Sequence, residues 1–185
     1  MLTIVKPAEI EVVSLAEVKA HLRLDHAFED DYLLTVIQAA TQSVESYLGK
    51  SLISRTWQLL WQPPAKREGD GLVEITLLYP PLIEIVSVYK VLSGDRKQPL
   101  KRYGLETMSS MPKLICAAAG EAVEVIYRAG YGDYPKNIPA SIRQALLVRI
   151  ADFYENRCSA GFEAKWNQDG MFKELLAPYR SVGLT

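Results

Sequence analysis

The sequence has few of the residues that build redox or metal sites. It contains two cysteines, Cys116 and Cys158, and two histidines in 185 residues. Two isolated cysteines exclude a disulfide framework and a Cys-x-x-Cys pair. No segment approaches the ~20 consecutive apolar residues of a transmembrane helix, and the N-terminus lacks the features of a secretion signal. We therefore expect the chain to fold in a reducing cytoplasm.

The chain also lacks an excess of charge of either sign. It has 21 Lys and Arg residues against 22 Asp and Glu residues, a formal net charge of −1. This balance gives no long-range attraction to nucleic acid or to an anionic membrane, although a local patch could bind either. Hydrophobic residues make up 49% of the chain, which is enough for one domain with a substantial core.

Motifs of catalysis are missing too. There is no Walker loop, no His-Glu-x-x-His helix and no Gly-x-Ser-x-Gly elbow. His21, His26 and the carboxylates of 25–31 could form a metal cluster, but we favour a solvated turn that places carboxylates at a helix start. Gly130-Tyr131-Gly132 is interpreted as a tight turn, because Asp133 would repel a phosphate. We predict no catalytic, cofactor-binding or metal-binding residues, and no enzyme activity.

Helical periodicity marks three parts of the chain. Ser14 and Glu17 have the spacing of a capping box, so a short helix should begin there. A second helix is predicted from Asp31 to Leu48, with Gly49 as its left-handed C-cap. Another is predicted to begin at 137–139 and to end near Asn156. A short terminal helix is expected from Met171 to Leu176, after a loop that covers 159–170.

The segment between these helices is rich in strand signals. Alternating apolar residues between Gly and Pro breaks predict strands at 56–62, 72–78, 83–92 and 122–127, with weaker ones at 102–106 and 113–116. Short turns favour an antiparallel meander. The fold class is therefore α+β in a single domain, 1–185. It has a helical core of 14–50 and 137–157, a long N-terminal helix hairpin plus a C-terminal helix. Residues 56–134 form an antiparallel β-rich insertion, and 158–185 form a tail.

Several stretches, spread over most of the chain, together resemble the head–tail connector (adaptor) proteins of tailed phages, a family formerly described as possible DNA-packaging proteins. These stretches are 15–25, 30–34, 39–40, 44–50, 56–57, 79–82, 85–88, 128–132, 138–139, 142–145, 153–157 and 175–180.

The resemblance implies a structural protein of a phage, prophage or gene-transfer particle. Its copies would form a ring, commonly of twelve, under the portal protein, receive the stopper or tail-completion protein, and let DNA pass. The expected place is the head–tail junction of the virion, with assembly in the host cytoplasm and no membrane partner. The resemblance implies no catalytic residue. The alternative is a small DNA-packaging factor or an enzyme that acts on DNA or nucleotide.

Aromatic residues supply the candidate contacts with the neighbouring subunit or the portal, because they provide large and stiff interface area. The candidates are Trp57, Trp61, Tyr131, Tyr134 and Trp166. Trp57 and Trp61 have a second interpretation of equal weight, in which they cover the protein's own core.

Basic pairs supply the candidate contacts with DNA. Arg96, Lys97, Lys101 and Arg102 lie at predicted loops or strand ends, as does the pair at 66–67. They either keep exposed loops soluble or face a channel and contact phosphates without sequence preference. In the second case, neutralising Arg96 and Lys97 should disturb DNA transit and leave assembly intact. We also expect that truncation after Arg157 spares the fold and abolishes attachment to heads.

Overall fold

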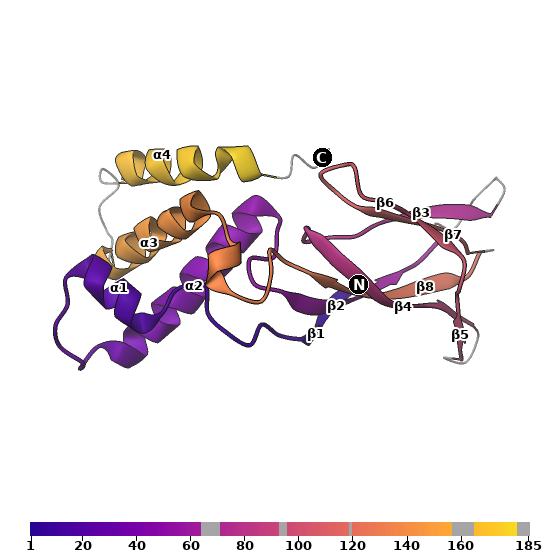
Figure 1. Ribbon diagram of the computed structural model, residues 1–185, viewed down its shortest axis with the longest axis horizontal. Coiled ribbons are helices and arrows are strands. Elements are labelled where there is room, and N and C mark those ends of the chain that lie inside the picture. The colour runs from indigo at the N-terminus through magenta and orange to yellow at the C-terminus, as the bar shows by residue number, and fades with distance from the viewer. Residues whose placement is uncertain (64–70, 93–95, 119, 157–164, 181–185) are drawn as a thin grey trace. The chain divides into compact units, whose positions relative to one another are not determined.

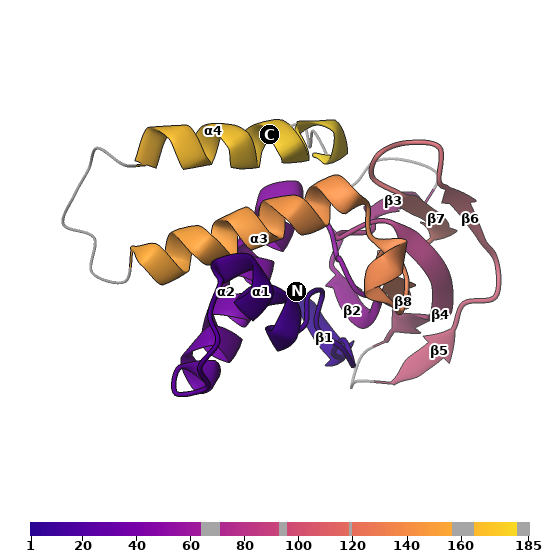
Figure 2. The same cartoon turned by 60° about the vertical axis from the view of Figure 1, so that its left-hand side comes forward.

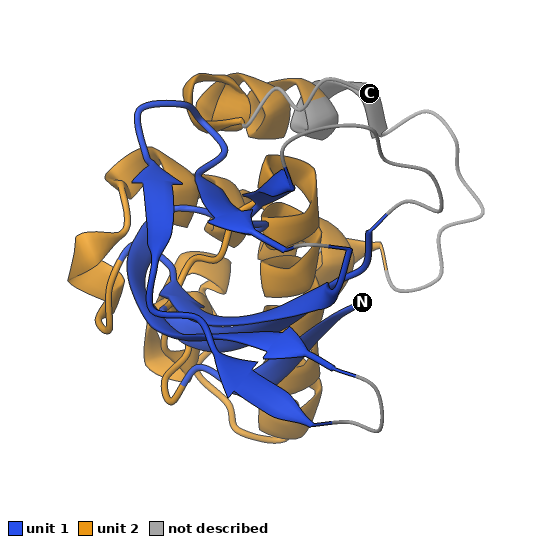
Figure 3. Cartoon of the chain, turned by 90° about the vertical axis from the view of Figure 1, so that its right-hand side faces the viewer, with its two compact units in different colours: residues 1–8, 54–131, 181–185 blue, residues 9–53, 132–180 orange. Residues whose placement is uncertain are grey.

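The computed structural model describes residues 1–63, 71–92, 96–118, 120–156 and 165–180, with the side chains of α4 described from residue 170 onward (Figure 1). The chain divides into two compact units, coloured separately in Figure 3. The β unit comprises residues 1–8, 54–131 and 181–185, and the helical unit comprises 9–53 and 132–180. The predicted bounds were 14–50 and 137–157 for the helical core, 56–134 for the β-rich insertion and 158–185 for the tail.

The described part of the helical unit contains four α-helices. They are α1 (Leu15–Leu22), α2 (Asp30–Leu48), α3 (Ala140–Glu155) and α4 (Lys165–Leu176), with 3₁₀ turns at Pro135–Asn137 and Ala177–Tyr179. The bounds of α2 and its C-cap at Gly49, with φ of 65°, agree with the prediction. Apolar residues at helical spacing form the core between α2 and α3, among them Ile37, Val44 and Leu146.

Half of the predicted capping box is present at the start of α1. The Ser14 hydroxyl accepts a hydrogen bond from the Glu17 backbone N–H at 3.2 Å. The Glu17 carboxylate does not complete the box in the described structure; it accepts a hydrogen bond from Arg143 of α3 instead. The prediction missed this because an ion pair between residues 126 positions apart leaves no local signal.

Helix α4 begins earlier than predicted. The sequence indicated a loop through Gly170, because residues 159–170 are polar around an isolated Trp166. The helix nevertheless runs from Lys165, alongside α3 (Figure 2). Phe172 and Leu176 are buried in the helical unit, so tertiary packing outweighs the low helix propensity. Truncation after Arg157 should therefore expose core surface, which corrects the expectation that it spares the fold.

The β unit contains two antiparallel sheets. The strands are β1 (Leu2–Lys6), β2 (Arg55–Trp61), β3 (Leu72–Thr76), β4 (Leu82–Val91), β5 (Lys97–Pro99), β6 (Tyr103–Glu106), β7 (Lys113–Ala117) and β8 (Ala122–Ala129). One sheet has the order β1-β2-β8-β4-β5, and the other has the order β3-β7-β6. The strands are antiparallel as predicted, but the simple meander is wrong, because β8 lies between β2 and β4 and β3 pairs with β7.

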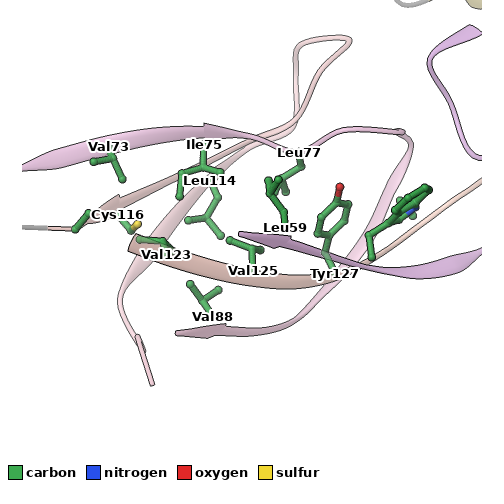
Figure 4. Close-up of a cluster of buried hydrophobic side chains, with 13 residues drawn as sticks. Leu59, Val73, Ile75, Leu77, Val88, Leu114, Cys116, Val123, Val125 and Tyr127 are labelled. Carbon is green, nitrogen blue, oxygen red and sulfur yellow. The ribbon is translucent and has the colours of Figure 1, made fainter. Parts of the chain in front are cut away.

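The inner faces of the two sheets enclose the core of the β unit (Figure 4). Val73 and Ile75 of β3 face Leu114 and Cys116 of β7 across the register, and all four are at most 2% exposed. Tyr127 of β8 is 1% exposed and donates its hydroxyl hydrogen to the Leu78 carbonyl at 2.9 Å. Alternation of buried and exposed residues along β3 therefore sets which face is in the core.

Candidate interaction surfaces

The acidic turn between α1 and α2 serves the helical unit. The Asp30 carboxylate lies 2.8 Å from the Lys19 ammonium, and the Glu29 carboxylate accepts a hydrogen bond from the Tyr154 hydroxyl of α3. His26 stacks on Phe28, with ring centroids 3.9 Å apart. Among the residues that the structure describes, no group of three or more His, Cys, Asp or Glu is placed to hold a metal ion. These contacts fasten the turn to α1 and α3.

The Gly-x-Gly segment forms the turn that leaves β8. Gly132 has φ of 146°, and a Cβ atom there would lie 2.7 Å from the Asn137 side chain. The Asn137 side-chain oxygen accepts a hydrogen bond from the Tyr134 backbone N–H at 3.1 Å. The second glycine is thus required by the close approach of Asn137, and the segment leads into a single 3₁₀ turn before α3.

The aromatic candidates differ in exposure. Trp57 is 7% exposed and stacks on Tyr79, with 4.6 Å between the ring centroids. It is therefore part of the core of the β unit. Trp61 is partly buried against the same cluster. Tyr131 is half-buried, whereas Tyr134 is 60% exposed with the Lys136 ammonium 5.4 Å from its ring centroid.

The side chain of Trp166 lies outside the described side chains, and its backbone is part of α4. Of the five aromatic candidates, Tyr134 presents the most surface for a partner among those whose side chains are described.

All four basic candidates are exposed, and Lys97 is in addition engaged in an ion pair. The Lys97 ammonium lies 2.8 Å from both carboxylate oxygens of Glu124, a residue of β8 that is 4% exposed. The Gln58 side-chain amide donates to the same carboxylate at 2.6 Å. Arg96, Lys101 and Arg102 are exposed. The basic pair at 66–67 lies outside the described residues.

Lys97 therefore neutralises a buried carboxylate, and its substitution would disturb the β unit itself. If Arg96 and Lys97 were neutralised together, a loss of DNA contact could not be distinguished from a loss of stability. The sequence did not reveal this, because 27 residues separate Lys97 from Glu124.

Burial makes the thiol of the described free cysteine unreactive. Cys116 is 2% exposed in the β core, and desolvation raises the pKa of its thiol. A buried thiol of raised pKa is a poor nucleophile, because the reactive species is the thiolate. Cys158 lies outside the described residues.

Exposed apolar residues on three segments of the chain were not predicted from the sequence. Ile4 and Val5 are 46% and 54% exposed on the edge strand β1. Phe28 is 81% exposed beside α2, and Met108 is 98% exposed after β6. Single exposed apolar residues are ordinary, but neighbouring ones on an edge or a helix face are typical of protein contacts.

Comparison with known proteins now supplies the context for these surfaces. Residues 12–79 match the family model of the phage gp6-like head-tail connector proteins. This match covers 68 of the 185 residues, so the chain is similar to that family over its N-terminal part. No curated protein matches the chain. No described helix has both the length and the apolar character needed to cross a membrane.

Solved structures extend the likeness beyond the family segment. A chain in the neck of an empty GTA particle, computed with C6 symmetry, has a TM-score of 0.80 and 27% sequence identity, with 100% of this chain and 97% of that chain covered. A chain in the virion of a native gene transfer agent (GTA) particle has a TM-score of 0.78 and 25% identity over the same coverage. A chain in the neck of a native GTA particle, with C12 symmetry and 24% identity, shares the fold at a TM-score of 0.78.

Proposed function

We propose that this protein is a structural head–tail connector that forms a ring between the portal and the tail of a phage, prophage or gene-transfer particle. The similarity to a chain of the GTA neck carries the proposal, because it spans 100% of this chain at a TM-score of 0.80. The family match at 12–79 supports the same role independently. The resemblance to connector proteins implies a ring of about twelve copies; of the two similar necks, one was computed with C12 symmetry and the other with C6 symmetry.

A ring of this kind requires two different surfaces on each copy. In cyclic assemblies above a dimer, one patch of a subunit contacts a different patch of the next subunit. The exposed apolar residues of β1, β6 and the start of α2 are candidates for such patches. The upper and lower surfaces of the ring would then receive the portal and the stopper or tail-completion protein.

The role needs no chemistry from the side chains. The carboxylates of Glu29, Asp30 and Glu124 engage partners within their own units, and Cys116 is buried. DNA would pass through the ring with phosphate contacts at most, because the net charge of −1 offers no general attraction. Arg96 is the basic residue that we assign to the channel, since it is exposed and Lys97 is not free to serve.

Deletion of the gene in a particle-producing strain tests the proposal against its alternative. We expect DNA-filled heads that lack tails, with attachment restored by the wild-type gene supplied on a plasmid. Electron microscopy and nuclease protection of packaged DNA measure the two properties separately. Empty heads would favour a packaging factor or enzyme, and normal tailed particles would refute the connector role. During infection the protein would be made in the host cytoplasm and end at the head–tail junction.

A further inference from the structure

The edge strand β6 carries an apolar face that its own unit leaves partly uncovered. In the register with β7, Tyr103 lies opposite Cys116, and Leu105 lies opposite Leu114. Directly opposed residues of an antiparallel pair point to the same side of the sheet. Cys116 and Leu114 are at most 2% exposed, whereas Tyr103 and Leu105 are 38% and 45% exposed. The apolar face of the core therefore continues onto β6, where its side chains are partly exposed to solvent.

Charge and a further apolar residue flank this face. Lys101 and Arg102 precede β6 and are exposed, and Met108, beyond its end, is 98% exposed. We call residues 101–108 the β6 arm. Among the described strands only β7 pairs with β6, and natural proteins usually cover or protect the other side of such an edge strand. The β6 arm thus combines an edge strand and an apolar face with two positive charges before the strand and one negative charge at Glu106.

A surface of opposite charge lies at the start of α2. Phe28, Tyr32 and Leu34 are 81%, 36% and 43% exposed. Asp25 and Asp31 are exposed and lie near them along the chain; Asp31, Tyr32 and Leu34 belong to the start of α2, and Asp25 and Phe28 lie in the turn before it. We call these five residues the Phe28 face. The segment 23–32 has four carboxylates against the single Arg23, so it is acidic overall.

We propose that the β6 arm of one copy binds the Phe28 face of the next copy around the ring. The proposal rests on the connector function and names the subunit contact within it. Both surfaces carry exposed apolar residues. Lys101 and Arg102 outweigh the Glu106 carboxylate in the β6 arm, whereas Asp25 and Asp31 make the Phe28 face negative. The two surfaces differ, as a heterologous contact requires. Lys101 and Arg102 then contact the neighbour's carboxylates rather than DNA.

Charge reversal tests the pairing in the full chain. Lys101→Glu with Arg102→Glu, or Asp25→Lys with Asp31→Lys, should weaken self-association by tenfold or more, on the order expected for two charge pairs turned repulsive. All four changes in one chain should restore much of the loss. Lys173→Glu is the control, because Lys173 is exposed and lies outside the two surfaces. Sedimentation velocity, with and without portal protein, measures association, and circular dichroism checks folding.

Cross-linking decides whether the contact joins different copies. In a Cys158→Ser background, which leaves the buried Cys116, Phe28→Cys and Leu105→Cys are combined in one chain and treated with a short bis-maleimide. A ladder of oligomers is expected. A mixture of the two single variants should stop at dimers, and each alone should give none. A flexible linker is preferable to a disulfide, which needs Cα atoms about 5.5 Å apart.

The outcomes distinguish failure of this subunit contact from failure of the connector function. Rings that form normally in the reversed variants, without a ladder, would refute the contact and leave the connector role intact. A link within a single chain would also refute it. Normal rings combined with impaired DNA transit would assign Lys101 and Arg102 to the channel instead. Loss of association in the reversed variants, restored by the fourfold variant, would support the proposal.

Discussion

Replacement of Lys97 by methionine tests whether this lysine supports the β unit rather than a DNA channel. Methionine keeps most of the apolar length of the side chain and removes the charge. In the variant, Glu124 would keep its hydrogen bond from Gln58 but lose the ammonium 2.8 Å from its carboxylate. The Glu124 side chain is 6% exposed, so water could replace the lost partner only after local opening.

The magnitude follows from the burial of the two partners. A hydrogen bond to a charged group contributes roughly 1.5–3 kcal/mol, and a buried charge left without its partner costs more. The Lys97 side chain is 46% exposed, so solvent screening reduces the effect. We expect Lys97→Met to lower the free energy of unfolding of the β unit by about 1–2 kcal/mol. Glu124→Gln should cost less, because it leaves no buried charge.

Urea unfolding followed by tryptophan fluorescence measures the change. Trp57 and Trp61 both lie on β2, so a Trp166→Phe background restricts the signal to the β unit. The expected loss corresponds to a midpoint lower by roughly 0.5–1 M urea. Arg96→Gln is the control and should leave the midpoint unchanged. The double variant with Glu124→Gln should lose less than the sum of the single losses. A Lys97→Met midpoint equal to that of Arg96→Gln would refute the reasoning.

Three further predictions follow from buried groups. Tyr127→Phe should cost about 1–2 kcal/mol in the same urea assay, because the Leu78 carbonyl loses its donor. Phe172→Ala should cost the helical unit about 3–4 kcal/mol, measured by circular dichroism, and truncation after Arg157 should destabilise it further; equal stability would refute the packing of α4. Burial raises the pKa values of Cys116 and Tyr127, so the folded state holds protons that the unfolded state releases. Their contribution to the free energy of unfolding should be fully present at neutral pH and should decrease above about pH 9. Tyr127→Phe should make that decrease smaller.

Local sequence signals predicted the helices well. The Ser14 cap, the bounds of α2 and the Gly49 C-cap depend on residues within one or two helical turns, and the structure confirms them. Helix α4 was predicted too short, because the polar residues before Met171 carry no apolar periodicity. The buried Phe172 and Leu176 lie in the part that was predicted.

Strand pairing was predicted less well, because partners are chosen over long separations. Turn signals located most strands, but β1 has an almost fully exposed pattern and is held by backbone pairing with β2, so no alternation marked it. The position of β8 between β2 and β4 depends on which apolar faces are buried together. The pairing of Lys97 with Glu124, which reassigns a candidate DNA contact, is a consequence of that order.

The β6 arm shows why a binding surface is harder to predict than a core. Tyr103 and Leu105 alternate as core residues do, and their partners across the register, Cys116 and Leu114, are buried. Only the sheet order reveals that β6 is an edge strand, whose apolar face extends beyond the buried part of the sheet. An edge of this kind favours association with whatever strand or apolar surface reaches it. In the proposed ring, a neighbouring copy would supply such a surface at high local concentration, and an edge that would be a liability in a monomer would become a means of assembly.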